Sequence, residues 1–434
     1  MSTPSFARVG SANTYDNARN NLMARQTALA NLQEHLTSGK RVNTASDDPT
    51  AAAQAERALT RINRIQADQR ALDAQKNAIT QAESTLGDVN DTLQSIRELV
   101  VNAGSGVHSA AERSIIAGQL KGLRDQVFAL SNRKDTNGQP LFGALASALT
   151  PFVGPQTTAP DYTFKGLPGQ TASSEVAIPF TLDGDSAFMH QPARDAVFNA
   201  TVSTIPTTRT LTTDNVVVTN TATVAATAAA ATTATGVPYP VYSIAFTAVD
   251  STTVPGTTTL TYSITETPSV TPLGAPAPFA PVTISYPSAT AAPITGIPGL
   301  SFSVTGTPAV GDTITIESQP SIFSTLDDAI LNIGSAANNN AAAQAVSQAL
   351  HNIDIGMARV SAVRGQAGDL LNRADRITDN QGKRSIQLEG DRSRAEDLDM
   401  IKGISDFQNQ HTGYQAALQS YAQVQKLSLF NFIS

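Results

Sequence analysis

The stretch "LTSGKRVNTASDDPTAA" (Leu36–Ala52) contains residue types that often bind phosphate or metal ions. A phosphate-binding loop requires a glycine five residues before its Gly-Lys pair and a Ser or Thr after the lysine, but Glu34 and Arg41 occupy these positions. A calcium-binding loop requires acidic residues that alternate along the chain, whereas Asp47 and Asp48 are adjacent. The spacing therefore argues against both kinds of site.

The same stretch has the features of a short connection between two helices. Gly39 can adopt the left-handed conformation that ends a helix, and Asp48 followed by Pro49 is typical of an N-cap and a first-turn proline. Apolar residues recur at intervals of seven on both sides of the connection, as they do in helices that pack along their length. The residues in these repeats are Leu22, Leu29 and Leu36 before the connection, and Leu72, Ile79, Leu86, Leu93 and Val100 after it. We expect them to lie in helix-bundle or subunit interfaces.

Helical patterns return toward the C-terminus. A helix is predicted to begin near Ser324, because Ser324 and Asp327 have the spacing of a capping box. A long helical run follows from Ala341, and we expect it to break at the polar segment 381–390 and then to resume. The interface residues expected here are Ile353 and Val360 before the break, Ile404, Phe407, Tyr414, Leu418 and Tyr421 after it, and Leu429, Phe430 and Phe432 farther on. His411 lies in the same repeat and is interpreted as an interface histidine rather than a metal ligand.

The middle of the chain has the pattern of strands. In "LTYSIT" (Leu260–Thr265) and "LSFSVT" (Leu300–Thr305), large apolar residues alternate with Ser and Thr, as in half-buried strands of antiparallel sheets. "TATVAATAAAATTATG" (Thr221–Gly236) is of low complexity, and we expect a loop there. Charged residues are sparse between 201 and 320.

These patterns predict an α+β fold in which N- and C-terminal helices form an elongated, coiled-coil-like bundle with an inserted antiparallel β region. The expected segments are terminal helices at 1–45 and 395–434, bundle segments at 46–145 and 319–394, and a β region at 146–318 with a possible second subdomain at about 201–310.

Composition and motifs narrow the classes of function. The chain of 434 residues has a net charge of −7 and no cysteine, which argues against nucleic-acid binding and excludes thiolate chemistry. Its five histidines are dispersed, and no hydrolase elbow, kinase signature or dinucleotide fingerprint occurs. We therefore expect no enzyme activity, no cofactor and no metal site. No apolar run is long enough for a secretory signal or a membrane span, so no membrane partner is expected.

Two motifs at opposite ends of the chain resemble those of bacterial flagellins and their hook-associated relatives. They are "LQEHLTSGKRVNTASDDPTAAAQAERA" (Leu32–Ala58) and "RAEDLDMIKGISDFQNQHTGYQAALQSYAQVQKLSLFNFI" (Arg394–Ile433). The similar regions cover roughly residues 1–145 and 320–434. Filament flagellins typically end on a segment with glutamine and proline followed by a leucine pair, which this chain lacks. Its ending is more similar to that of the hook-associated branch that joins hook to filament.

The resemblance implies an extracellular structural protein of the flagellum. Such a subunit is exported unfolded by the type III flagellar route without signal cleavage, and it assembles as a ring between hook and filament. Its terminal helices line the inner tube. The implied partners are other copies of the chain, the adjacent hook-associated protein, filament flagellin and an export chaperone. Two alternatives remain open at this point: filament flagellin itself, and a secreted adhesin with a β binding module on a helical stalk.

Overall fold

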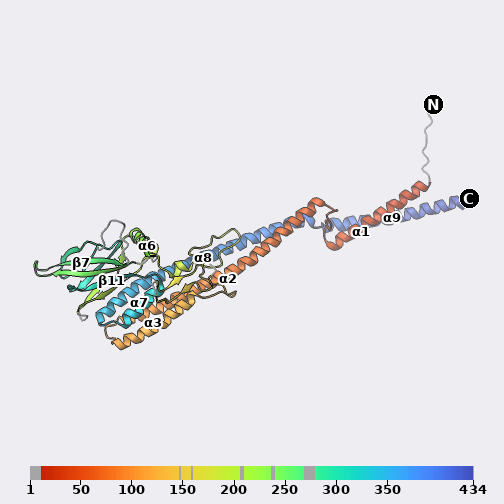
Figure 1. The fold of residues 1–434 in the computed structure, drawn as a ribbon. Helices are drawn as coiled ribbons and strands as arrows, with labels where there is room; N and C mark the ends of the chain where they lie inside the picture. The colour runs from red at the N-terminus through yellow and green to blue at the C-terminus, as the bar shows by residue number, and fades with distance from the viewer. Residues whose placement is uncertain are drawn as a thin grey trace, which may run out of the picture. The chain divides into compact units, whose positions relative to one another are not determined.

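The computed structural model describes residues 11–145, 148–157, 160–205, 210–235, 240–267 and 279–433 (Figure 1). The chain divides into two compact units. The terminal unit comprises the residues up to Arg70 and those from Ile377 onward, and the central unit comprises Ala71–Arg376. Two long helices, α2 (Pro49–Ala103) and α8 (Asn339–Glu396), contribute residues to both units.

The order of elements along the chain confirms the predicted α+β fold, with helices at both ends and antiparallel strands between them. The other helices are α1 (Ser11–Ser38), α3 (Ala110–Ser131), α4 (Gly184–Phe188), α5 (Pro192–Asp195), α6 (Thr221–Thr235), α7 (Ile322–Gly334) and α9 (Met400–Ile433). The strands are β1 (Phe152–Val153), β2 (Thr163–Phe164), β3 (Phe198–Ser203), β4 (Leu211–Thr213), β5 (Val217–Val218), β6 (Val241–Asp250), β7 (Thr257–Thr267), β8 (Val282–Pro287), β9 (Ala292–Ile294), β10 (Leu300–Gly306) and β11 (Thr313–Ser318).

Local capping explains where several helices begin. Helix α2 starts after Asp48, whose Oδ1 accepts hydrogen bonds from the backbone N–H groups of Thr50 at 3.1 Å and Ala51 at 3.0 Å. The prediction that Ser324 caps α7 was wrong by one helical turn. Ser321 is the N-cap, because its hydroxyl accepts a hydrogen bond from the N–H of Ser324 at 3.0 Å, and Ser324 lies inside the helix.

The predicted break at 381–390 was also wrong. Helix α8 continues through this segment to Glu396, since the charged side chains Lys383, Arg384 and Glu389 are exposed while Leu388 remains buried. The helical interruption lies at residues 397–399 instead. A polar composition alone does not end a helix when it lacks proline and when its apolar positions keep the helical period.

The helical core of the central unit consists of α2, α3, α7 and α8. The repeat residues of α2 in this unit are buried, and so are two from α8: Leu72, Ile79, Leu86, Leu93, Val100, Ile353 and Val360. Helices α3 and α7 add an aromatic cluster around Phe323, which is fully buried. The ring centroid of Phe323 lies 5.2 Å from those of both Phe128 and Tyr162, which suits favourable ring packing.

The strands of the central unit form antiparallel sheets. The five-stranded sheet has the order β3-β11-β6-β7-β8, and its central register pairs Ile314 with Ile244 and Ile244 with Ile264. A second sheet has the order β4-β10-β5, with β9 also paired to β10. The alternation predicted for β7 and β10 is confirmed, because Leu260, Tyr262 and Ile264, like Leu300, Phe302 and Val304, are buried in one shared core.

The prediction of a loop at 221–236 was wrong, because Thr221–Thr235 forms helix α6. Alanine has the highest helix propensity, and Val224, Ala228 and Ala231 recur at helical spacing on the buried face. Several threonine hydroxyls bond back to the carbonyl four residues earlier, for example Thr227 to Thr223 at 3.0 Å.

Candidate assembly surfaces

The stretch at Leu36–Ala52 forms one half of a joint in the terminal unit. The joint consists of two connectors: residues 39–48, between α1 and α2, and residues 397–399, between α8 and α9. Backbone hydrogen bonds tie the connectors together: the N–H of Leu398 donates to Gly39 O at 2.9 Å, and the N–H of Arg41 donates to Glu396 O at 2.7 Å. Gly39 has φ +70°, the left-handed conformation expected from the sequence.

Charged side chains close the same joint. The Arg41 guanidinium donates to Ala395 O at 2.8 Å and pairs with Asp48 at 3.2 Å, and Lys40 forms an ion pair with Glu396. The Asp47 carboxylate accepts hydrogen bonds from the backbone N–H groups of Asn43 and Thr44. The bond from Thr44 is the main cause that lowers the pKa of Asp47. The hydrogen bond from the Ala51 N–H is the main cause that lowers the pKa of Asp48 to about 2. Both aspartates that suggested a metal loop therefore act as loop and helix caps.

Helices α1 and α9 pack along a seam in the terminal unit. Helices α1 and α9 are in contact, and the less exposed positions of α9 include a series spaced alternately four and three residues apart. The series consists of the buried Gly403 and the half-buried Phe407, Gln410, Tyr414, Ala417 and Tyr421. A Cβ atom at Gly403 would lie 3.2 Å from Leu36 Cδ2, and one at Gly413 would lie 2.6 Å from Arg25 Nη1. The two helices therefore approach closely where α9 carries glycine.

The predicted interface residues fall on two different faces of the terminal helices. Those that lie half-buried along the α1–α9 seam are Leu22, Leu29, Leu36, Phe407, Tyr414 and Tyr421. Ile404 and Leu418 are 46% and 42% exposed, and together with the exposed His411 they form a second seam that lies outside the α1 contact. The side chains of Leu429, Phe430 and Phe432 lie outside the described residues. The repeat that faces α1 is thus shifted by one residue from the predicted series through Ile404.

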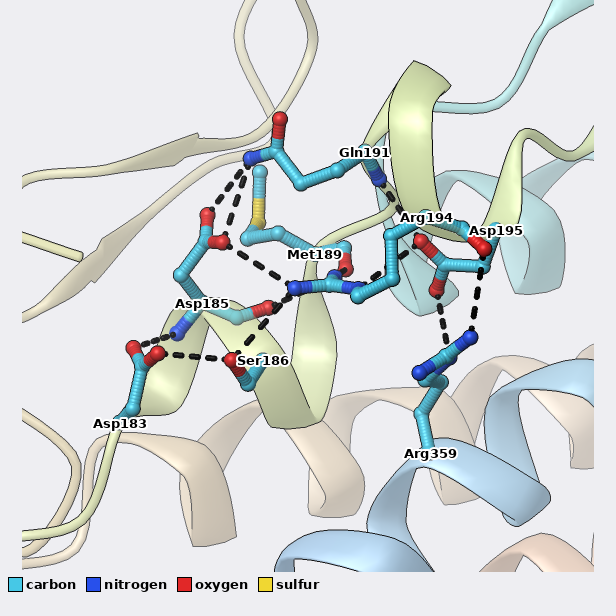
Figure 2. A network of polar contacts seen from close by, with 8 residues as sticks. All are labelled: Asp183, Asp185, Ser186, Met189, Gln191, Arg194, Asp195 and Arg359. Atoms are coloured by element: carbon cyan, nitrogen blue, oxygen red, sulfur yellow. Dashed lines mark hydrogen bonds and ion pairs between the residues drawn. The ribbon is translucent and has the colours of Figure 1, made fainter. Parts of the chain in front are cut away.

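A buried polar network holds the start of the five-stranded sheet to helix α8 in the central unit. Figure 2 shows this clamp, which consists of Asp183, Asp185, Ser186, Met189, Gln191, Arg194, Asp195 and Arg359. The Asp195 side chain is 2% exposed, and its two oxygens pair with Arg194 Nε and Arg359 Nε, each at 3.0 Å. Asp195 also accepts from the backbone N–H of Gln191 at 3.0 Å. The clamp was not found from the sequence, because Arg359 lies far along the chain from the adjacent Arg194 and Asp195.

Two titratable groups close to the clamp have strongly shifted pKa values. His190 is fully enclosed, and burial lowers its pKa to about 4, although its Nδ1 lies 3.1 Å from Gln319 O. Burial raises the pKa of Asp328 to about 6, although one of its oxygens accepts from Asn199 Nδ2 at 2.9 Å and from Gln319 Nε2 at 2.6 Å. His190 is therefore neutral at pH 7, whereas Asp328 binds its proton only below about pH 6 and is charged above it.

Replacing Asp328 with asparagine should stabilise the chain at pH 7 and have a smaller effect near pH 4. The folded state holds the Asp328 proton more tightly than the unfolded state, so the wild type gains stability as the pH falls through about 6. His190 acts in the opposite direction between about pH 6.5 and 4, but it is common to both proteins. We expect a difference in unfolding free energy of roughly 3 kcal/mol at pH 7, measured by urea unfolding across this pH range. If the difference in unfolding free energy between the two proteins stays constant with pH, burial does not raise the pKa of Asp328.

Other kinds of site find no support in the described part of the chain. No group of three His, Asp or Glu residues among the described residues could hold a metal ion. Over the same residues, none of the helices combines the length and the apolar character that crossing a membrane requires.

Comparison with known proteins matches both ends of the chain. The family model for the bacterial flagellin N-terminal helical region matches residues 9–146, and the model for the bacterial flagellin C-terminal helical region matches residues 350–433. Together these segments include α1, α2, α3, α9 and most of α8.

Individual relatives extend the comparison. Flagellar hook-associated protein 3 of Salmonella typhimurium is 32% identical over 149 residues, which are 33% of this chain and 46% of that protein. Flagellin 1 of Proteus mirabilis is 34% identical over 137 residues, 31% of this chain and 37% of that protein. The chain thus matches less than half the length of these relatives. The structure of the flagellar junction protein from Legionella pneumophila superposes with a TM-score of 0.53 and 25% identity over 74% of this chain and 98% of that chain.

Proposed function

The chain belongs to the bacterial flagellin family, and on this basis we propose that it is the structural subunit that joins the flagellar hook to the filament. The observation that carries the proposal is the likeness to the Legionella junction protein, because it extends over 98% of that protein and 74% of this chain. The matches to Flagellin 1 of Proteus mirabilis and to the flagellin of Escherichia coli cover 31% and 28% of this chain. A junction subunit is therefore favoured over a filament subunit.

The second seam supports an assembling protein. Helices α1 and α9 cover one face of each other, which leaves Ile404 and Leu418 exposed in a single chain. Exposed apolar side chains in a regular row mark a surface for other protein chains. We infer that neighbouring copies cover the second seam when the subunits form a ring. The adjacent hook-associated protein and filament flagellin contact the two ends of this ring, and an export chaperone binds the chain before assembly.

The chain is thus proposed to act outside the cell, after export in an unfolded form without signal cleavage. It needs no catalysis for this role, and its charged groups serve to hold the joint and the clamp. Its strand-rich region is proposed to form an outer domain that takes no part in the contacts between subunits.

Immunogold labelling of flagella tests the proposal directly. An antibody against the central unit should label the boundary between hook and filament and leave the rest of the filament unlabelled. Cells without the gene should make hooks, export flagellin as monomer into the medium and form no filaments. Labelling along the whole filament would identify a filament flagellin instead, and normal filaments in the deletion strain would overturn the junction role.

The isolated chain should exchange the amide hydrogens of α1 and α9 quickly. Among residues 16–38, whose side chains the structure describes, none is fully buried, whereas Ile79, Leu86 and Leu93 of α2 are completely buried. Local opening costs little free energy where few apolar groups are buried. Exchange measured by mass spectrometry should be slow in residues 79–100 and fast in both terminal helices, and it should slow in the terminal helices when the chain is in flagella. Equal protection of α1 and α2 in the monomer would contradict this expectation.

A further inference from the structure

The terminal unit contains an open groove between α2 and α8, which we call the arginine groove. Its volume is about 390 Å³. The floor is apolar and built from small or buried side chains, namely Ala58, Leu388 and Ala395. The rim carries Arg57, Arg61 and Arg394.

The rim has an excess of positive charge. Arg394 forms an ion pair with Asp391, which also lines the groove. Arg57 and Arg61, by contrast, make no ion pair or side-chain hydrogen bond with the described part of the chain. This local excess stands out in a chain with a net charge of −7. The groove therefore suits a carboxylate next to an apolar side chain.

The start of α9 presents that combination on the same chain. We call Asp399, Met400 and Ile401 the knob. Ile401 is 85% exposed, more than any other large apolar side chain among the described residues, and Met400 is 45% exposed. Asp399 Oδ1 caps α9 by accepting from the N–H groups of Ile401 at 3.1 Å and Lys402 at 3.2 Å. No hydrogen bond to Oδ2 is present within the described residues, so this oxygen can accept from outside.

We propose that the knob of one copy docks in the arginine groove of the next copy. Ile401 would cover the floor at Ala58 and Leu388, and the Asp399 carboxylate would pair with Arg57 or Arg61. Within a single chain the two surfaces do not satisfy each other, because Ile401 is exposed and the groove is open. A second copy is the occupant that the structure favours, since one chain supplies both complementary halves. Two different patches in contact make a heterologous interface, which builds a ring or a helical array of subunits.

The inference of this contact rests on the proposed function. Cysteine cross-linking tests the contact separately from the function. Because the chain has no native cysteine, the double variant Gln54→Cys with Met400→Cys places one thiol at the groove and one in the knob. A matched control pairs Met400→Cys with Ile386→Cys, which is 76% exposed on α8 but does not line the groove. Flagella from cells that produce each variant are oxidised with copper phenanthroline and examined by non-reducing immunoblot.

The groove variant should give a ladder at multiples of 45.3 kDa, and the control should remain largely monomeric. A groove variant that is present in flagella without a ladder, or a control with an equal ladder, would overturn the contact. The wild-type chain in the same preparations reports on the proposed function alone: its absence from flagella would overturn that function and this contact with it.

Charge removal provides a second, independent measurement. Asp399→Asn keeps the N-cap, because asparagine caps as well as aspartate, but it removes the charge. Arg61→Gln and Arg57→Gln remove the charges of the groove. Asp399→Asn and the double arginine variant should each reduce the amount of chain in flagella, and their combination should reduce it no further, because all three residues act in one contact. Strictly additive losses would show that the groove and the knob act separately.

Discussion

Asp195→Ala should lower the free energy of unfolding of the chain by about 3–5 kcal/mol, the cost of removing one partner from a buried ion pair. The Asp195 carboxylate is almost completely buried and pairs with both Arg194 and Arg359. Without it, the partly buried Arg359 guanidinium loses its carboxylate partner, and Arg194 keeps its weaker ion pair with Asp185 at 3.5 Å. Urea unfolding followed by far-UV circular dichroism provides the measurement.

Asp354→Ala is the matched control, and Asp354 lies on α8, the helix that carries Arg359. Asp354 also pairs with an arginine, Arg97 Nε at 2.9 Å, but the two side chains are 52% and 38% exposed. An ion pair in solvent contributes less than about 1 kcal/mol. If Asp195→Ala destabilises the chain no more than Asp354→Ala, the clamp does not hold the sheet to the helix.

The double substitution Ile404→Asp with Leu418→Asp should abolish filaments and leave the isolated chain folded. Both residues belong to the exposed second seam, so the free energy of unfolding should change by no more than about 0.5 kcal/mol. Covering two carboxylates with a neighbouring subunit costs far more, because a buried charge requires a partner. Electron microscopy should reveal hooks without filaments, and an immunoblot should detect flagellin monomer in the medium.

Asn409→Asp with Ser420→Asp is the control for this experiment. It adds the same charge to α9 at two exposed positions on another face of the helix. Filaments should form with this variant. Loss of filaments in both variants would attribute the effect to charge alone, and normal filaments in the first would show that subunits do not meet at the second seam.

The sequence predicted the helical ends well because their repeats are apolar at nearly every core position. In α2 the predicted repeat has the correct register, since Leu72, Ile79 and Leu86 are all buried as a regular repeat requires. In α9 only the series through Ile404 was placed one residue away, because the side facing α1 uses Gly403 and Ala417 there; the series through Phe407 and Tyr414 lies on that side. Small residues let two helices approach closely, but they carry little apolar signal.

Distant contacts explain the remaining differences. Asp195, Arg194 and Arg359 become a clamp only when α5 packs against α8, and no local spacing reveals this. Helix α6 was missed because alanine and threonine in alternating runs resemble a low-complexity linker. Its identity as a helix depends on burial of Val224 and Ala228 against strands that are far away in the sequence.

The joint also determines when the chain can finish folding. Its hydrogen bond from Arg41 to Glu396 connects residues that are separated by most of the polypeptide. Contacts with such large sequence separation form late, because a long loop must close before they contribute any stability. Whichever end of the polypeptide is exported first therefore cannot complete the joint until the other end is also available. A chain that lacks either connector cannot close the joint, so closure requires that both long helices, α2 and α8, are present.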